Sequence, residues 1–318
     1  MTRILVTGGA GYIGSTATAI LLERGHEVAV FDDLSMGHAD SVPQGADFFE
    51  GSLLDPDALR NALVGCQAVM HFAGKSLVGE SVEKPDLYHH VNVDGTQNLL
   101  DAMAVHGIDR IVFSSSAATY GQPDEDPITE DAPAAPTNPY GASKLAIDQM
   151  ISASNVSAIS LRYFNVAGAY ESKFGWLPER HNPETHLIPL VLRATEANPL
   201  KIFGTDWNTK DGTCIRDYVH VVDLIEAHIL SLNALQSQKS RGHQIINLGS
   251  GGGYSVREVI QVAEKVLGRA VPAVESPRRA GDPASLVASI AKAGEILGWK
   301  PTRNLETMIS DAVKSQAQ

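Results

Sequence analysis

The chain has 318 residues, of which 43% are hydrophobic and 19% are charged, and its formal net charge is −12. This composition is typical of a compact soluble protein with one large or two smaller domains. The negative charge disfavours nucleic acid and anionic membranes as partners. Cys66 and Cys214 lie far apart in the sequence, so we expect neither a disulfide framework nor a metal site. The N-terminus shows no cleavable leader pattern, and no apolar stretch reaches membrane-spanning length, which favours a cytoplasmic protein.

The first part of the chain alternates between strand and helix patterns. Arg3–Thr7 is a short apolar run that ends in glycines, and Tyr12–Arg24 then carries apolar residues at helical spacing. Further strands are predicted, with helical stretches between the main ones, at Glu27–Phe31, Asp47–Glu50, Ala68–Phe72, Arg110–Ser114, Ser157–Phe164 and Gln244–Leu248. This alternation predicts an α/β fold with a doubly wound parallel sheet covered by helices on both faces.

A second, more irregular lobe is predicted to start near Gly168, because prolines interrupt short apolar pieces from there to about Gly212. We expect a dinucleotide-binding domain over residues 1–167 and a smaller mixed α/β substrate-binding lobe over residues 168–318. The two interleave, with segments near 213–249 returning to the first domain. Ser255–Leu267 and Asn304–Gln316 predict helices of the small lobe, the first with a serine cap and a glutamate three residues later.

The glycines after the first strand have the spacing GxGxxG, at Gly9, Gly11 and Gly14. Such a turn lets the backbone approach a pyrophosphate, whose charge meets free amides at the start of the following helix. A glycine-rich turn without a ligand is the ordinary alternative for so short a pattern. Asp32 ends the second strand, where its carboxylate can accept hydrogen bonds from ribose hydroxyls and repel a 2′-phosphate. NAD is therefore favoured over NADP.

Tyr140 and Lys144 lie four residues apart at a predicted helix start, where Asn138 can cap the helix and Pro139 suits its first turn. A tyrosine hydroxyl titrates near pKa about 10, so it acts as a base near neutrality only beside positive charge, which Lys144 and an oxidised nicotinamide ring can supply. Ser116, at the carboxyl end of a predicted strand, can hydrogen-bond the reacting oxygen. Without the glycine turn, an ordinary exposed Tyr and Lys pair is the favoured interpretation.

Several motifs together resemble the extended short-chain dehydrogenase/reductase superfamily: TGGAGYIG, HFAG, SSSAATYG and PYGASK. The segments GES, LRYFN, DGTCIRDYVHV and PRRAGD, the last at Pro277–Asp282, narrow the resemblance to the UDP-glucose 4-epimerase family over essentially the whole chain. The resemblance implies an NAD-dependent isomerase that interconverts UDP-galactose and UDP-glucose through a 4-keto sugar. It also implies a homodimer built from Asp86–His106 and the helix after Pro139.

The resemblance also implies site residues. The catalytic residues are Tyr140, Lys144 and Ser116. The cofactor-binding residues are Gly8, Gly11, Tyr12, Ile13, Gly14, Asp32, Asp33, Ser52, Leu53, Phe72, Ala73, Gly74, Lys75, Asn92, Ser114, Tyr140, Lys144 and Phe164. The substrate-binding residues are Ser116, Tyr140, Asn165, His186, Leu187, Lys201, Ile202, Phe203, Arg216, Tyr218, Arg279 and Asp282. Arg216 and Arg279 suit a clamp on the diphosphate, because guanidinium groups offer several donors in one plane.

Three positions depart from the pattern of better-known relatives. Ser52 stands where an aspartate usually holds the adenine, and Ser76 where many relatives carry a lysine, although Lys75 is adjacent. Leu286 faces the carbon-2 substituent of the sugar in the resemblance, where relatives carry either tyrosine or a small residue. Acceptance of N-acetylated sugars therefore stays open.

Three functions other than hexose epimerisation share parts of these motifs. A 4,6-dehydratase needs an acid and a base after the catalytic hydroxyl, where this chain has Ala117 and Ala118. Epimerases of other UDP-sugars, such as N-acetylhexosamines or pentoses, remain open. A non-catalytic NAD-binding sensor is disfavoured because Tyr140, Lys144 and Ser116 are all present.

Overall fold

The computed structural model describes residues 2–237, 242–279 and 281–316. Ala280 of the PRRAGD motif lies outside the described residues, as do residues 1, 238–241, 317 and 318. No helix among the described residues is long and apolar enough to cross a membrane.

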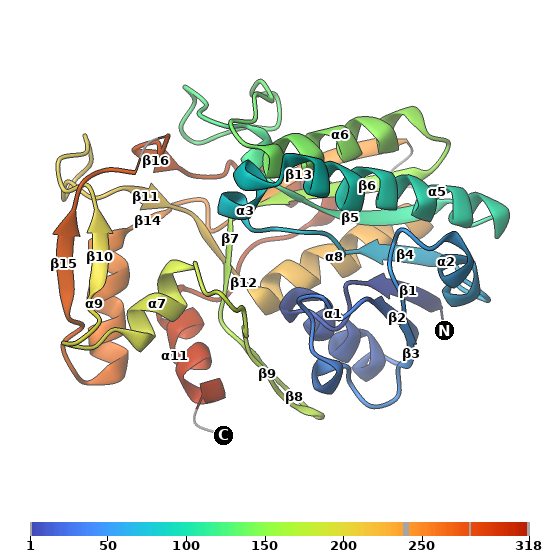
Figure 1. The fold of residues 1–318 in the computed structure, drawn as a ribbon, viewed down its shortest axis with the longest axis horizontal. Coiled ribbons are helices and arrows are strands. Elements are labelled where there is room, and N and C mark those ends of the chain that lie inside the picture. The colour runs from blue at the N-terminus through green and yellow to red at the C-terminus, as the bar shows by residue number, and fades with distance from the viewer. Residues whose placement is uncertain (1, 238–241, 280, 317–318) are drawn as a thin grey trace.

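A parallel sheet of seven strands forms the centre of the larger lobe (Figure 1), with the order β13-β6-β5-β4-β1-β2-β3. Its strands are β1 (Arg3–Thr7), β2 (Glu27–Asp32), β3 (Asp47–Glu50), β4 (Ala68–His71), β5 (Arg110–Ser116), β6 (Ser157–Tyr163) and β13 (His243–Leu248). The strand order reverses direction at β1, between its neighbours β2 and β4, and ligands of doubly wound sheets bind at the carboxyl ends of strands at such a point. The predicted fold class is confirmed.

Helices cover both faces of this sheet, as predicted (Figure 1). On one face α1 (Tyr12–Glu23), α8 (Val221–Gln236) and α10 (Ala291–Leu297) pack into one hydrophobic core. On the other, α2 (Pro56–Ala62), α5 (Gly95–Val105) and α6 (Pro139–Ala153) pack into a second core. The shorter turns on this side are α3 (Val78–Glu83), α4 (Pro85–Tyr88) and η2 (His89–Asp94), while η1 (Ala39–Ser41) and η3 (Ala117–Thr119) follow β2 and β5.

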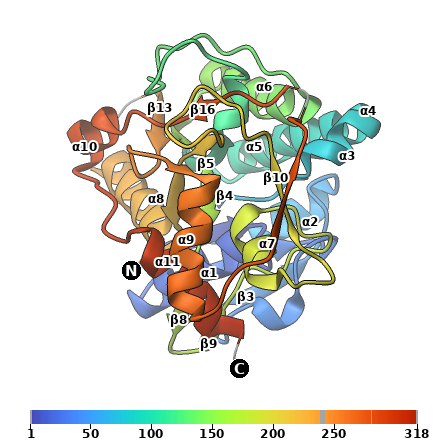
Figure 2. The ribbon, with the colours of Figure 1, turned by 90° about the vertical axis from the view of Figure 1, so that its left-hand side faces the viewer.

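The smaller lobe consists of short strands and three helices around a third core. Its helices are α7 (Leu187–Arg193), α9 (Val256–Leu267) and α11 (Leu305–Gln316), which Figure 2 shows close together in front of the sheet. Its strands form small sheets: β10 (Leu200–Phe203) with β15 (Ala273–Ser276), and β11 (Ile215–Arg216) with β14 (Tyr254–Ser255) and β16 (Ser285–Leu286). Two further strand pairs are β7 (Asn165–Ala167) with β12 (Tyr218–His220), and the hairpin β8 (Tyr170–Ser172) with β9 (Gly175–Leu177).

The local sequence signals explain where several elements begin and end. The Ser255 hydroxyl accepts a hydrogen bond from the Glu258 amide while the Glu258 carboxylate accepts one from the Ser255 amide, so α9 starts with a capping box. Strand β5 extends to Ser116, two residues beyond the expected end, because Ser116 pairs with Tyr163 of β6.

The chain returns to the large sheet late in the sequence, because β13 pairs with β6 in parallel and α8 packs on the same face as α1. Ile215 and Arg216, in contrast, pair within the small lobe. We therefore propose the division given by the sequence, residues 1–167 and 168–318, with the return to the first domain carried by α8 and β13 and, beyond the expected 213–249, by α10.

Candidate active site

The glycine turn between β1 and α1 is packed against the chain after β4. A Cβ added at Gly8 would lie 2.6 Å from the amide nitrogen of Ala73, and one at Gly14 would lie 2.1 Å from the carbonyl oxygen of Gly8. At Gly11, which caps α1, an added Cβ would meet only the Gly8 oxygen, at 3.4 Å. Gly8 and Gly14 therefore allow close packing, and Gly11 keeps space in front of the helix open.

Asp32 lies at the carboxyl end of β2, beside this turn. One carboxylate oxygen accepts a hydrogen bond from the Ala10 amide at 3.0 Å, and the other accepts one from the Leu34 amide at 2.9 Å. Burial raises the pKa of Asp32, and these two backbone donors oppose that shift. The carboxylate is thus fixed in position.

A cavity at the carboxyl ends of β1, β2 and β4 brings most of the predicted cofactor-binding residues together. It encloses about 1250 Å³ of space, open solvent at its mouth included, and runs from the glycine turn to Lys144. The predicted residues that line it are Gly8, Gly11, Tyr12, Ile13, Gly14, Asp32, Asp33, Ser52, Leu53, Phe72, Ala73, Gly74, Lys75, Tyr140 and Lys144. Ser76 lines it as well.

Three predicted cofactor-binding residues lie outside the cavity lining. Asn92 is buried and bridges the backbone of Lys75 and the hydroxyl of Ser143, so it supports the loop that carries Lys75. The Ser114 carbonyl accepts a hydrogen bond from the Lys144 ammonium. Phe164 packs in a separate cluster with Leu286. The aromatic residue that lines the cavity in this region is its neighbour Tyr163.

Tyr140 stands in the first turn of α6, where the Asn138 side chain accepts a hydrogen bond from the Gly141 amide. Its phenol interacts with Ser116, which ends β5. Burial raises the pKa of Tyr140, and the interaction with Ser116 opposes that shift. The protein without cofactor therefore keeps this phenol protonated, and additional positive charge is needed to form the phenolate.

Lys144 lies one turn further along α6 and is 5% exposed. Its ammonium donates to the Ser114 carbonyl at 2.8 Å and lies 5.9 Å from the centre of the Tyr140 ring. Burial lowers the pKa of Lys144 to about 8, while Asp148 opposes the shift. Lys144 is thus a buried cation close to Tyr140 and to the cofactor cavity.

Predicted substrate-binding residues of the small lobe converge from separate short strands. The Arg216 guanidinium on β11 donates to the Pro283 carbonyl at 3.0 Å and lies 3.6 Å from the Asp282 carboxylate. The Asn165 amide on β7 donates to the Asp217 carbonyl at 2.8 Å. The strand pairing between β11 and β16 places Leu286 opposite Arg216.

Arg279 is exposed, and its guanidinium lies 3.9 Å from the centre of the Phe203 ring on β10. Lys201 and Ile202 belong to the same strand, Lys201 exposed and Ile202 buried. Tyr218 is buried against Tyr254, and burial raises its pKa well above the usual range. His186 and Leu187 stand at the start of α7.

Two segments of the cavity lining were not predicted from the sequence. One follows Asp33 and contains Ser35, Met36, Gly37, His38 and Ser41. The other contains Pro178, Arg180 and His181. The first could have been found from its place directly after a strand end, whereas the second reaches the cavity only through tertiary structure.

Comparisons with known proteins agree with this geometry. Residues 4–249 match the model of the NAD dependent epimerase/dehydratase family. A UDP-glucose 4-epimerase of Corynebacterium glutamicum is 51% identical over 98% of this chain and 94% of its own length. The chain therefore belongs to the UDP-glucose 4-epimerase family, as the motifs predicted.

Solved structures of the family superpose closely on this chain. The UDP-glucose 4-epimerase of Brucella ovis in complex with NAD gives a TM-score of 0.94 at 42% identity, covering 99% of this chain and 98% of that one. The UDP-glucose-4-epimerase of Stenotrophomonas maltophila, with bound NAD and formylated UDP-arabinopyranose, gives 0.94 at 36% identity, covering 100% and 98%.

The residues of this chain fit a dinucleotide. Gly11 leaves the first amides of α1 without a capping side chain, and the first residues of α1, Tyr12, Ile13 and Gly14, line the cavity. The fixed Asp32 carboxylate lies at the same cavity, where ribose hydroxyls can donate to it. Ser52, which replaces the usual aspartate, and Lys75, which neighbours the usual lysine position, both line the cavity.

Proposed function

We propose that the protein interconverts UDP-galactose and UDP-glucose by transient oxidation of carbon 4, with Tyr140, Ser116 and Lys144 as its catalytic residues. The proposal rests on one observation: Tyr140 and Lys144 line the same cavity as the glycine turn, and Ser116, which ends β5, interacts with Tyr140. A proton acceptor and a dinucleotide cradle thus share one site.

NAD, when bound, supplies a hydride acceptor for carbon 4 and a donor for the return step. Gly8, Gly11 and Gly14 would admit its pyrophosphate to the start of α1, and Asp32 would accept hydrogen bonds from its adenosine ribose. Lys144 would bind the nicotinamide ribose. Asn92 holds the Lys75 loop through hydrogen bonds to both backbone groups of Lys75, at 2.7 and 3.0 Å.

Tyr140 accepts the proton of the 4-hydroxyl as carbon 4 loses its hydride, which leaves a 4-keto sugar. The Lys144 ammonium, 5.9 Å from the ring centre, favours the phenolate by its charge, and Ser116 can pass the proton between the sugar oxygen and Tyr140. In the return step Tyr140 gives the proton back to the ketone oxygen. Proton and hydride are both restored, so the net reaction only inverts carbon 4.

The inversion requires the keto sugar to turn over while its nucleotide stays bound. Arg216 on β11 and Arg279 in the segment after β15 would hold the diphosphate, and Asn165, Leu187, Phe203, Tyr218 and Asp282 would complete the UDP site. Rotation about the phosphate linkage then presents the other face of the ketone.

The position of Leu286 supports the proposal that the sugar binds between the two lobes. Leu286, Phe164 and Ala117 all pack against the buried cluster of Tyr120, Ile128 and Ala132, and Ala117 directly follows Ser116. A leucine here is intermediate in size, so UDP-N-acetylhexosamines and UDP-pentoses remain alternative substrates of the same chemistry.

We further propose a cytoplasmic homodimer that pairs α5 and α6 with their copies in a second chain. Supporting this, Val105 at the end of α5 is 69% exposed, and a shallow groove runs between the ends of α5 and α6, lined in part by Leu100, Ala104 and Met150. Molecular mass from light scattering tests the dimer.

A direct assay tests the proposed activity. The purified protein is incubated with UDP-galactose without added reductant, and UDP-glucose is measured over time. Sustained formation of UDP-glucose is expected. If UDP-galactose binds but no UDP-glucose forms, the protein is a non-catalytic sensor instead.

A further inference from the structure

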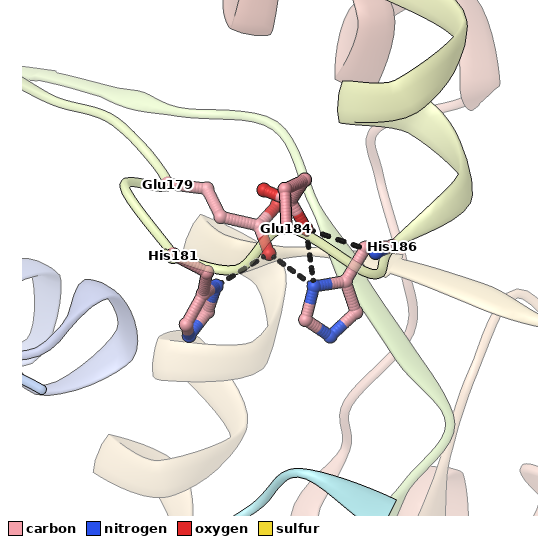
Figure 3. A group of neighbouring side chains, drawn as sticks. All are labelled: Glu179, His181, Glu184 and His186. Carbon is pink, nitrogen blue, oxygen red and sulfur yellow. Dashed lines mark hydrogen bonds and ion pairs between the residues drawn. The ribbon is translucent and has the colours of Figure 1, made fainter. Parts of the chain in front are cut away.

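Four side chains between β9 and α7 meet at one point (Figure 3). They are Glu179, His181, Glu184 and His186, and one donor atom of each lies within 4.8 Å of all the others. His186 Nδ1 lies 2.8 Å from Glu179 Oε1 and 2.9 Å from Glu184 Oε1, and His181 Nδ1 lies 2.9 Å from Glu179 Oε1. The spacing is Glu-x-His-x-x-Glu-x-His. We refer to these four residues as the Glu179 cluster.

The two carboxylates of this cluster are buried. The Glu179 side chain is 8% exposed and that of Glu184 only 3%. Glu184 Oε1 already accepts hydrogen bonds from the amides of Thr185 and His186, at 2.8 and 2.9 Å. Glu184 Oε2, on the same carboxylate, is buried and has no hydrogen-bond partner among the described residues. A buried carboxylate oxygen without a partner is costly, and a bound cation would remove that cost.

The donor set suits a divalent transition metal. Two imidazole nitrogens and two carboxylate oxygens are ligands of Zn²⁺, which takes four donors at about 2.0–2.2 Å in a tetrahedron. The donors of such a tetrahedron are about 3.4 Å apart. The donor atoms of the four residues are from 2.8 Å to no more than 4.8 Å apart, a range that includes this spacing.

We propose that the Glu179 cluster binds one divalent transition-metal ion, with Zn²⁺ as the ion that best matches its ligands. The prediction of no metal site considered only the cysteines, and this spacing of histidines and glutamates was not used.

The position of the cluster gives the metal a consequence for the cofactor. Residues 178–181 line the cofactor cavity on one side of the cluster, through Pro178, Arg180 and His181. The Arg180 guanidinium pairs with Asp40 at 2.9 Å, and the Arg180 carbonyl lies 3.3 Å from the His38 ring, so this segment reaches the loop after β2. A metal at the Glu179 cluster would fix the segment across the cavity and slow the release of NAD. This consequence, unlike metal binding itself, rests on the proposed function.

Metal binding can be measured without substrate. The full chain is freed of metal with a chelator, dialysed, and titrated with Co²⁺ and with Zn²⁺. We expect one equivalent of Co²⁺ to give the visible absorption of a four-coordinate ion. Zn²⁺ at about 100 times its Kd should raise the melting temperature by roughly 4 °C.

Glu184→Gln keeps the size of the side chain but removes a charged ligand, and should weaken Zn²⁺ binding by about 100-fold or more. Glu196→Gln is the matched control, because Glu196 is exposed on the turn after α7. It should bind like the wild type. Equal Zn²⁺ affinity in the wild type and Glu184→Gln, or a wild type that gives no Co²⁺ spectrum, would overturn the proposal and leave a metal-free ion-pair cluster.

A second variant covers the case in which Glu184→Gln does not fold. The His181 ring is 24% exposed, so His181→Gln removes a ligand with less burial change, and its loss of the Co²⁺ spectrum would support the site.

The dissociation rate of NAD is then compared with and without Zn²⁺. Metal binding without slower release would refute the link to the cofactor but not the site, and failure of epimerisation would leave both metal measurements valid.

Discussion

The two sides of the active site are built differently. On the cofactor side, the groups are fixed by backbone packing and burial: a Cβ at Gly8 would lie 2.6 Å from the Ala73 amide nitrogen, and Lys144 is 5% exposed. On the substrate side, Arg279 is exposed and Arg216 lies on a strand of two residues. The small lobe therefore presents long, adjustable side chains where the large lobe presents a rigid frame.

This difference matches the demands of an inversion at one carbon. Hydride transfer requires the cofactor to stay at one place through both half-reactions, so a preformed site suits it. The sugar must change its orientation between those steps. Contacts that hold only the UDP part of the substrate, and leave the hexose free to turn, therefore suit this reaction. Substitutions on the cofactor side should therefore change NAD binding, whereas substitutions on the substrate side should change the KM for the UDP-sugar.

The largest effect is expected where the two sides meet, at Tyr140. Tyr140→Phe removes the proton acceptor but keeps the ring, so kcat should fall by about 10³-fold while NAD stays bound. Two quantities are measured: the rate of UDP-glucose formation and the NAD content of the purified variant. A rate near that of the wild type would exclude Tyr140 from the mechanism.

The glycine turn tests the rigid side. A Cβ at Gly14 would lie 2.1 Å from the Gly8 oxygen, so Gly14→Ala should destabilise the protein by about 2–3 kcal/mol and abolish NAD binding. Gly11→Ala meets only one atom, at 3.4 Å, and should keep the fold while reducing NAD affinity by about 10-fold or more because it fills the cavity. Thermal melting and NAD titration compare them. Equal stability of both variants would contradict the assigned roles.

Arg279 tests the adjustable side. Arg279→Ala should raise the KM for UDP-galactose by about 10-fold, a typical loss for one charged contact, with little change in kcat or NAD content. Arg278→Ala is the control, because Arg278 pairs with Asp206 at 2.8 Å and stacks on Trp207 instead. Similar KM values for both variants would argue against a diphosphate contact by Arg279.

The smallest effect is expected at Leu286. Leu286→Gly should raise the kcat/KM for UDP-N-acetylgalactosamine relative to UDP-galactose by a few-fold to about 10-fold, and Leu286→Tyr should lower that ratio, because the pocket changes only in volume. A competition assay with both substrates measures the ratio. Changes in the same direction for both variants would place Leu286 away from carbon 2.

The large lobe was predictable because its signals are local. Strands and helices of the sheet follow from apolar runs and glycines, and Tyr140 and Lys144 share one helix turn with its cap, Asn138. In the cofactor cavity, Gly8 to Gly14 and Asp32 are close in sequence to the strands that position them.

Tertiary contacts between distant segments were not predictable in this way. Arg180 and His181 line the cavity only because the segment after β9 crosses to the loop after β2. Tyr163, and not Phe164, lines the cavity because neighbouring residues at the end of β6 point to opposite sides. The Glu179 cluster needs a loop geometry that spacing alone does not specify.

The central claim is that the same hydride leaves carbon 4 and returns to it while the cofactor stays bound. The most direct measurement uses UDP-galactose deuterated at carbon 4, in ordinary water, with mass analysis of the UDP-glucose formed. The account predicts that the product retains its deuterium at carbon 4. Loss of the deuterium to solvent would contradict it, because carbon 4 would then exchange through a proton and not through a hydride.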